Sequence, residues 1–235
     1  MLKLVDVSKR FGALSVLQNL DLTVAAGNVL GVIGPNGAGK TTLFNIIAGA
    51  QVPSAGQVHL DDRDITHVKV WDRCRLGIGR TYQVPKPFTH MSVFENVMVA
   101  AVHGGRMGIR AAKEQAQHVI ELTGLIHRLR TPAGHLSLLD LKRLELAKAL
   151  AQKPRLLLLD EIAGGLTESE CDTLLEIVKT ARDQGATIVW IEHVLHALRR
   201  IATRLAVLHG GTIISSGAPD EVLADSRVKE VYLGV

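Results

Sequence analysis

The sequence predicts an α/β fold with a mostly parallel sheet, antiparallel edge strands and a helical subdomain. Short apolar runs bounded by glycine or polar residues recur along the chain, and segments of helical period separate many of them. Three runs, VLGVI, LLLLD and TIVWI, are apolar at consecutive positions, which is typical of strands buried on both faces of a parallel sheet. With 235 residues, 47% of them hydrophobic, the chain is long enough for a large buried core.

In chain order, the strands and helices follow from the spacing of apolar residues. KLVDVSKRF and VLQNLDLTV alternate apolar and polar residues, as exposed antiparallel strands do, and the buried strand VLGVI follows them. Between about residues 67 and 152 we expect no strand, because MSVFENVMVAAV, RAAKEQAQHVIELTGL and LLDLKRLELAKALAQ have apolar residues three and four apart. These segments predict a helical subdomain at about 84–152, with hinges at VPKPF and PAGHLS. Further strands are predicted at RLLLLD, ATIVWIE, RLAVLH and GTIISSG.

Composition and charge exclude several classes of protein. No apolar stretch approaches the roughly 18 residues that cross a bilayer, and no apolar segment follows the N-terminal charges, so we expect neither a membrane span nor export. Cys74 and Cys171 lie far apart and fit no metal-ligand spacing, which indicates reduced, buried thiols. The net charge of +4 comes from scattered lysines and arginines, and the aromatic content of 3% is low for base stacking, so no nucleic-acid partner is expected.

The segment GPNGAGKTT at 34–42 matches the phosphate-binding pattern G-x-x-x-x-G-K-[ST]. It lies directly after VLGVI and directly before an apolar helical run, where backbone N–H groups and a helix N-terminus can bind phosphate oxygens. Lys40 adds a charge for the β- and γ-phosphates, and Thr41 adds a hydroxyl for Mg2+. We therefore expect a nucleoside triphosphate to bind at Gly34, Asn36, Gly37, Ala38, Gly39, Lys40, Thr41 and Thr42.

The run LLLLDE at 156–161 supplies the second half of such a site. It reads as a buried strand that delivers a carboxylate at its C-terminal end, beside the phosphates. Asp160 is the predicted Mg2+ ligand, and Glu161 is placed to orient or deprotonate the attacking water. Asp160 and Glu161 together therefore favour a protein that hydrolyses the nucleotide over one that only binds it.

With both motifs present, the chain resembles an ATP-binding cassette (ABC) ATPase, the motor subunit of ABC transporters, over essentially its whole length. Phe11 matches the aromatic residue on which adenine stacks, Gln83 matches the glutamine that links the Mg2+ site to the helical subdomain, and His193 matches the histidine that contacts the γ-phosphate. The resemblance implies one ATPase domain over 1–235, with the helical subdomain inserted in the P-loop core. It also implies ATP and Mg2+ as cofactors, catalysis by Glu161, His193 and Gln83, and metal binding by Thr41, Gln83 and Asp160.

The signature segment departs from the family pattern Leu-Ser-Gly-Gly-Gln, because this chain has Leu136-Ser137-Leu138-Leu139-Asp140. In the family this segment binds the γ-phosphate held by a partner subunit, so the resemblance assigns Ser137 to ATP. Two leucines hinder close approach, and Asp140 brings negative charge toward the phosphates. The alternative is that Leu138 and Leu139 pack inside the helical subdomain and this half of the site is weakened. The following D-loop, at 163–167, lacks the usual proline, and Gly165 and Leu166 are matched to the dimer interface only loosely.

Several stretches are similar to the motor subunits of branched-chain amino acid uptake systems, among them LGIGRTYQ, MSVFENVMVA, IEHVLHAL and the ending GAPDEVLADSRVKEVYLGV. The resemblance implies an ATP-hydrolysing subunit that pairs with an identical or related one and moves transmembrane permease subunits through residues 83–94. A solute-binding protein would be an indirect partner, and the subunit would be peripheral on the cytoplasmic face of the bacterial inner membrane. Import of branched-chain amino acids or a similar small solute rests on this likeness, since no residue identifies the solute.

Two alternatives stay open at this point. A nucleotide-gated regulatory subunit with weak turnover fits the altered LSLLD segment, whereas Glu161 and His193 argue against it. A soluble ABC protein outside transport fits less well, because such proteins resemble tandem cassettes or carry long coiled-coil insertions. The sequence has no N-K-x-D motif for guanine and no recognisable acceptor site or arginine-rich lid of a kinase.

Overall fold

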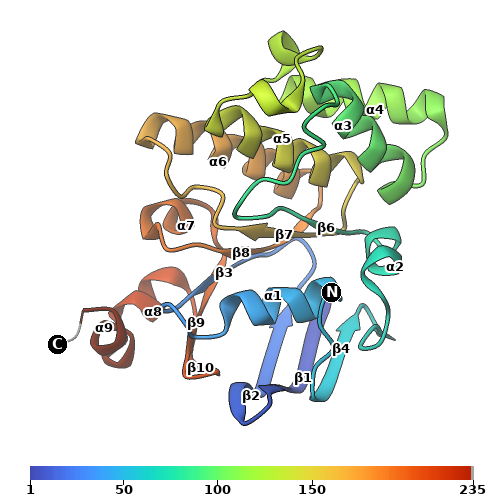
Figure 1. Cartoon of the computed structure of the whole chain (residues 1–235). Helices are drawn as coiled ribbons and strands as arrows, with labels where there is room; N and C mark the ends of the chain where they lie inside the picture. Colours follow the sequence, from blue (N-terminus) through green and yellow to red (C-terminus); the bar gives the residue numbers. More distant parts are fainter. Residues whose placement is uncertain (234–235) are drawn as a thin grey trace. The chain divides into compact units, whose positions relative to one another are not determined.

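A computed structural model describes residues 1–233, which form strands, α-helices and shorter helical turns (Figure 1). The chain divides into a first unit, Met1–Arg73 with Thr187–Val235, and a second unit, Cys74–Ala186. Both units combine helices with parallel strands, so the predicted α/β class is confirmed. In the described part of the chain, no helix has the length and apolar character to cross a membrane.

The alternating N-terminal segments form an antiparallel sheet in the first unit, with the strand order β2-β1-β4-β5. Alternate residues of β1 are buried, among them Leu2 and Leu4, and the same holds for Leu20, Leu22 and Val24 of β2. This alternation of buried and exposed residues agrees with the antiparallel strands that the sequence predicts. The members of the sheet are β1 (Leu2–Phe11), β2 (Leu14–Val24), β4 (Ala55–Leu60) and β5 (Arg63–Asp64).

The consecutive apolar runs of the first unit form parallel strands. β3 (Val29–Ile33) pairs in parallel with both β8 (Thr187–Ile191) and β9 (Arg204–His209), and β10 (Thr212–Gly217) adds an antiparallel edge to β9. Every residue of β3 and β8 is buried, as their composition predicts. The helices of this unit are α1 (Lys40–Ala48), α7 (Leu195–Ile201), α8 (Pro219–Ala224) and α9 (Ser226–Leu233), and α2 (Val70–Arg75) runs across the boundary into the second unit.

The second unit has one parallel strand pair and most of the helices. β6 (Ile78–Arg80) pairs in parallel with β7 (Leu156–Asp160), whose residues are all buried. Ser92 and Thr167 form capping boxes at the starts of α3 and α6, where each side chain and the glutamate three residues on exchange hydrogen bonds. The helical elements are α3 (Val93–Val99), the π-helical turn η1 (Ala100–Gly104), α4 (Ile109–Leu122), the 3-10 turns η2 (Ile126–Arg128) and η3 (Ala133–His135), α5 (Leu138–Ala151) and α6 (Glu168–Asp183).

Two expectations from the sequence are wrong in detail. A strand, β6, lies inside the range 67–152 where none is expected; it is only three residues long and contains a single apolar side chain, Ile78, which leaves no periodic signal. Cys74 is half-buried, with its Sγ donating to Gln152 Oε1 at 2.9 Å, whereas Cys171 is buried as expected.

Candidate functional site

The glycine-rich loop at 34–42 joins β3 to α1, and two of its glycines are required by close approaches. A Cβ on Gly34 would stand 2.1 Å from the carbonyl oxygen of Leu208 in β9, so a larger residue does not fit. Gly39 caps the start of α1 with a φ of 105°, a left-handed conformation, and a Cβ there would lie 2.8 Å from a methyl group of Leu17 in β2. The loop is therefore held tightly between β9 and β2.

Lys40 folds back over the loop that precedes it. Its Nζ donates to the carbonyl oxygens of Gly34 at 2.6 Å and Pro35 at 3.0 Å, and only 8% of the residue is exposed. The positive charge is thus fixed at the loop, where it attracts phosphate oxygens. The other predicted phosphate-binding residues are Asn36, Gly37 and Thr41, which are exposed, Gly39 and Thr42, which are half-buried, and Gly34 and Ala38, which are buried.

Arg73 binds the opposite end of the P-loop helix, a contact that the sequence did not predict. All five N–H donors of its guanidinium have carbonyl partners at 2.5–2.9 Å, and the side chain is 1% exposed. Burial lowers the pKa of Arg73 to about 10, which leaves it charged at neutral pH. The charge binds the last carbonyls of α1, which has no basic residue in its own last turn. The five acceptors are the carbonyl oxygens of Ile46, Ile47, Ile65, Thr66 and Val68.

Phe11, the predicted adenine platform, ends β1 and is 46% exposed. Lys9 Nζ lies 5.0 Å from the centroid of its ring and donates to the Val52 carbonyl at 2.7 Å. An exposed ring with a fixed cation beside it is available for stacking. The β1–β2 hairpin that carries Phe11 is also the one that approaches Gly39 of the P-loop through Leu17.

His193, the predicted γ-phosphate contact, follows β8 and has an exposed side chain. Its backbone N–H donates to Glu192 Oε1 at 3.1 Å, and its Nδ1 lies 3.6 Å from the same oxygen. Glu192 is fully buried and accepts a hydrogen bond from Trp190 Nε1 at 3.3 Å. Glu192 therefore contacts both the backbone and the ring of His193, and the sequence offered no sign of this beyond an acidic residue between a buried strand and a histidine.

In the second unit the structure brings the predicted catalytic residues Gln83 and Glu161 together. Gln83 Nε2 donates to Glu161 Oε2 at 2.5 Å, although the two residues are far apart in sequence. Asp160, at the end of β7, accepts from Arg80 Nη2 at 3.1 Å, and its backbone N–H donates to Thr81 Oγ1 at 3.1 Å. Arg80 and Thr81, on and directly after β6, were not among the predicted site residues because a three-residue strand gave no pattern to place them.

The three predicted Mg2+ ligands, Thr41, Gln83 and Asp160, offer a hydroxyl, an amide and a carboxylate. Mg2+ prefers hard oxygen donors and takes only one or two carboxylates beside substrate phosphates and water. Across residues 1–233, no cluster of three or more His, Cys, Asp or Glu could hold a metal ion alone. Because the hydrogen bond to Glu161 uses the amide nitrogen of Gln83, the amide oxygen is the atom suited to the ion. Taken one by one, the oxygens of these three residues are donors of the kind that Mg2+ prefers.

The signature segment begins α5, and Ser137 caps it: its Oγ accepts from the Asp140 N–H at 3.2 Å. Leu138 is 50% exposed and Leu139 is half-buried, so the alternative in which both leucines pack inside the helical subdomain does not hold for Leu138. Asp140 is 6% exposed and lies 3.6 Å from both Arg128 and Arg143, which balance its charge. In the D-loop, Gly165 lies next to the signature segment, since a Cβ on it would be 3.8 Å from Leu138.

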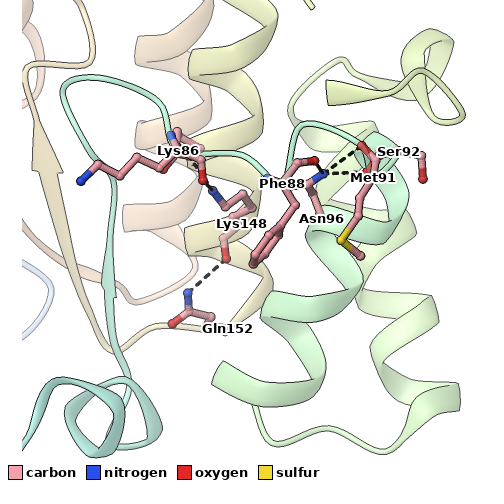
Figure 2. Close-up of polar contacts among 8 residues, drawn as sticks. Lys86, Phe88, Met91, Ser92, Asn96, Lys148 and Gln152 are labelled. Atoms are coloured by element: carbon pink, nitrogen blue, oxygen red, sulfur yellow. Dashed lines mark hydrogen bonds and ion pairs between the residues drawn. The ribbon is translucent and has the colours of Figure 1, made fainter. Parts of the chain in front are cut away.

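Hydrogen bonds hold the VPKPF segment to the helices of the second unit (Figure 2). Asn96, which is fully buried, binds both the N–H and the carbonyl of Phe88, at 2.8 and 3.1 Å. Lys86 is held by α5, because its N–H donates to Glu145 at 2.8 Å and its carbonyl accepts from Lys148 at 2.8 Å. Val84 and Phe88 are nevertheless 70% and 52% exposed. A rigid backbone with exposed apolar side chains is typical of a docking surface.

A glycine-rich loop between a buried parallel strand and a helix, with a lysine at the start of that helix, defines a P-loop nucleotide-binding protein. The chain belongs to the ABC transporter family. The family model described as ABC transporter matches residues 17–164, and the model described as Branched-chain amino acid ATP-binding cassette transporter matches residues 212–235. The protein is therefore the ATP-binding subunit of an ABC transporter, a family whose members hydrolyse ATP to drive transport.

Known proteins resemble the chain over nearly its full length. LptB of Acidithiobacillus ferridurans, the ATP-binding protein of a lipopolysaccharide export system, is 33% identical over 235 residues, covering 100% of this chain and 97% of LptB. LivG of Salmonella typhimurium, a high-affinity branched-chain amino acid transport ATP-binding protein, is 33% identical over 240 residues, covering 96% of this chain and 94% of LivG. The solved ADP conformation of MJ1267, an ATP-binding cassette of an ABC transporter, has a TM-score of 0.90 at 29% identity and covers 100% of this chain and 99% of MJ1267.

Proposed function

We propose that this ATPase drives an importer of branched-chain amino acids or a similar small solute. The observation that carries the proposal is the match of residues 212–235 to the branched-chain amino acid cassette model. This segment lies outside residues 17–164, which the general ABC transporter model matches, and the description of its model supports a subunit of the branched-chain amino acid type. The similarity to LivG supports the same assignment.

In this proposal, the chain is one ATPase domain over residues 1–235 with a helical subdomain at about 84–152. The loop at 34–42 binds the phosphates of ATP, and Phe11 stacks on the adenine. Mg2+, when bound by Thr41, Gln83 and Asp160, neutralises phosphate charge. The fixed position of the Lys40 ammonium and the exposed ring of Phe11 support these roles.

Glu161 orients the attacking water and accepts its proton, which is the work of a general base. The hydrogen bond from Gln83 supports this role, because it holds the carboxylate of Glu161 in one orientation. His193 contacts the γ-phosphate, and the buried carboxylate of Glu192 sets the position of its backbone and ring. Hydrolysis therefore depends on side chains that neighbouring hydrogen bonds already orient.

The active form is a pair of ATP-binding subunits, identical or related, that close around ATP and then reopen. Ser137 of one subunit contacts the ATP held by the P-loop of the other. The exposed VPKPF segment, within residues 83–94, docks on a transmembrane permease subunit, and a solute-binding protein acts through that permease. The subunit is then peripheral on the cytoplasmic face of the bacterial inner membrane.

Lipopolysaccharide export is a second candidate, because LptB is 33% identical over the whole chain. The test is to isolate the membrane subunits that the tagged chain captures from its source membranes and to reconstitute the complex in proteoliposomes. Import predicts that a binding protein loaded with leucine stimulates ATP turnover and that labelled leucine crosses the membrane. Stimulation by lipopolysaccharide without leucine transport would assign the protein to export, and capture without any ATP turnover would favour a regulatory subunit.

A further inference from the structure

Lys142 lies on α5, two residues after Asp140, and its ammonium group is buried against the loop that follows β7. The residue is 6% exposed. Its Nζ donates to the carbonyl oxygens of Glu161 at 3.3 Å, Ile162 at 3.0 Å and Gly164 at 2.6 Å. An ammonium group has three N–H donors, so a single loop offers a carbonyl partner for each.

The loop begins at Glu161 with an unfavourable backbone conformation. Glu161 has a φ of 46°, in the left-handed region that residues other than glycine rarely adopt. Such a conformation persists only where surrounding contacts hold it. Lys142 supplies such contacts, since it binds the carbonyl of Glu161 itself and two more in the next three residues. The side chain of Glu161 is also held, because Gln83 donates a hydrogen bond to its carboxylate.

Packing alone does not account for a lysine at this place. Burial of a charged group is costly unless hydrogen bonds compensate for it, and an apolar side chain of similar length would fill the same space on α5 without that cost. The positive charge is matched to a loop whose carbonyls converge on it. Its removal would leave these carbonyls without this partner and free Glu161 to leave its left-handed conformation.

We propose that Lys142 is a positioning residue for ATP hydrolysis: it holds the backbone at Glu161 so that the carboxylate is aimed at the attacking water. The proposal rests on the role of Glu161 proposed above. It also makes α5 the link between the signature segment, at the start of that helix, and the catalytic carboxylate. Lys142 needs no contact with ATP to act in this way.

The test compares Lys142→Met and Lys142→Arg with the unchanged chain, in kcat and KM for ATP, nucleotide affinity measured with a fluorescent ATP analogue, and thermal midpoint. Lys142→Met should lower kcat by about 100-fold, the usual effect of a small misplacement at a reacting centre, with KM and nucleotide affinity within about twofold. Lys142→Arg should restore most of kcat, because it keeps the charge and the donors. Two variants serve as controls. Lys179→Met removes the charge of an exposed lysine on α6, and Thr123→Val removes a buried hydrogen bond.

A double-mutant cycle identifies the residue through which Lys142 acts. In single-turnover assays with Glu161→Gln, the further change Lys142→Met should have little effect, since the carboxylate to be aimed is already lost. Equal effects of Lys142→Met in both backgrounds, or a kcat within twofold of the unchanged chain, would overturn the inference while the role of Glu161 stands. If Lys142→Met does not fold, Lys142→Gln, which keeps an N–H donor, is subject to the same criteria. Full turnover by Glu161→Gln alone would instead refute the proposed catalytic role.

Discussion

Replacement of Arg73 by methionine tests how strongly the P-loop helix is held at its C-terminal end. The substitution removes five hydrogen bonds to backbone carbonyls from a side chain that is 1% exposed. At a net contribution of about 0.5–1.5 kcal/mol each, these bonds sum to roughly 2.5–7.5 kcal/mol. Burying an apolar side chain in place of the charge offsets part of this, so we expect a loss of about 3–5 kcal/mol in the free energy of unfolding.

For a chain of this size, such a loss lowers the thermal midpoint by roughly 6–20 °C. Circular dichroism during heating, together with urea titration, measures both quantities. Arg75→Met is the matched control, because Arg75 lies on the same helix with an exposed side chain and should change stability by at most about 0.5 kcal/mol. A loss below about 1 kcal/mol for Arg73→Met would refute the reasoning that this guanidinium fixes α1.

Three further predictions concern the loop, the signature segment and acid stability. Gly34→Ala should lower turnover by about 100-fold in a steady-state assay, because its Cβ would stand 2.1 Å from a carbonyl of β9; near-normal turnover would contradict this. Leu138→Gly should raise the turnover of a homodimer several-fold at a stability cost of about 1 kcal/mol, because it removes a half-exposed side chain from the segment that, in the proposed dimer, meets the partner's ATP; unchanged turnover would show that leucine is accommodated. Hydrogen bonds from the backbone and side chain of Ser92 lower the pKa of Glu95 below its ordinary 4.5, so this capping box stabilises the fold above about pH 4.5 and loses that contribution as the pH falls through the lowered pKa. In urea titrations from pH 7 to 3, the free energy of unfolding should therefore fall less steeply with acid for Glu95→Gln than for the unchanged chain. Parallel curves for the two proteins would contradict the predicted direction of this effect.

Local patterns predicted the strands and the phosphate loop, because consecutive apolar residues and a glycine-rich motif carry their own signal. VLGVI and TIVWI are buried parallel strands, and GPNGAGKTT joins the first of them to a helix. The resemblance to ABC ATPases paired Gln83 with the Mg2+ site, and the structure adds a direct bond from it to Glu161.

Residues that act through long-range polar contacts could not be predicted in this way. Arg73, Lys142 and Glu192 are single charged residues whose partners no sequence pattern indicates, and only the folded chain shows that each is buried and hydrogen-bonded to a specific backbone segment. Asp140 illustrates the same limit: the sequence indicated a negative charge near phosphate, whereas Arg128 and Arg143 lie beside it in the structure. Side-chain partners depend on tertiary packing, which spacing along the chain does not encode.

The most direct test of the account is ATP turnover of the purified chain as a function of its own concentration, beside Lys40→Ala and Glu161→Gln. If two subunits complete each site, turnover rises faster than linearly with concentration, both variants are inactive, and ATP shifts Glu161→Gln to a dimer in size-exclusion chromatography. A chain that binds ATP but stays monomeric and inactive would contradict the homodimeric motor.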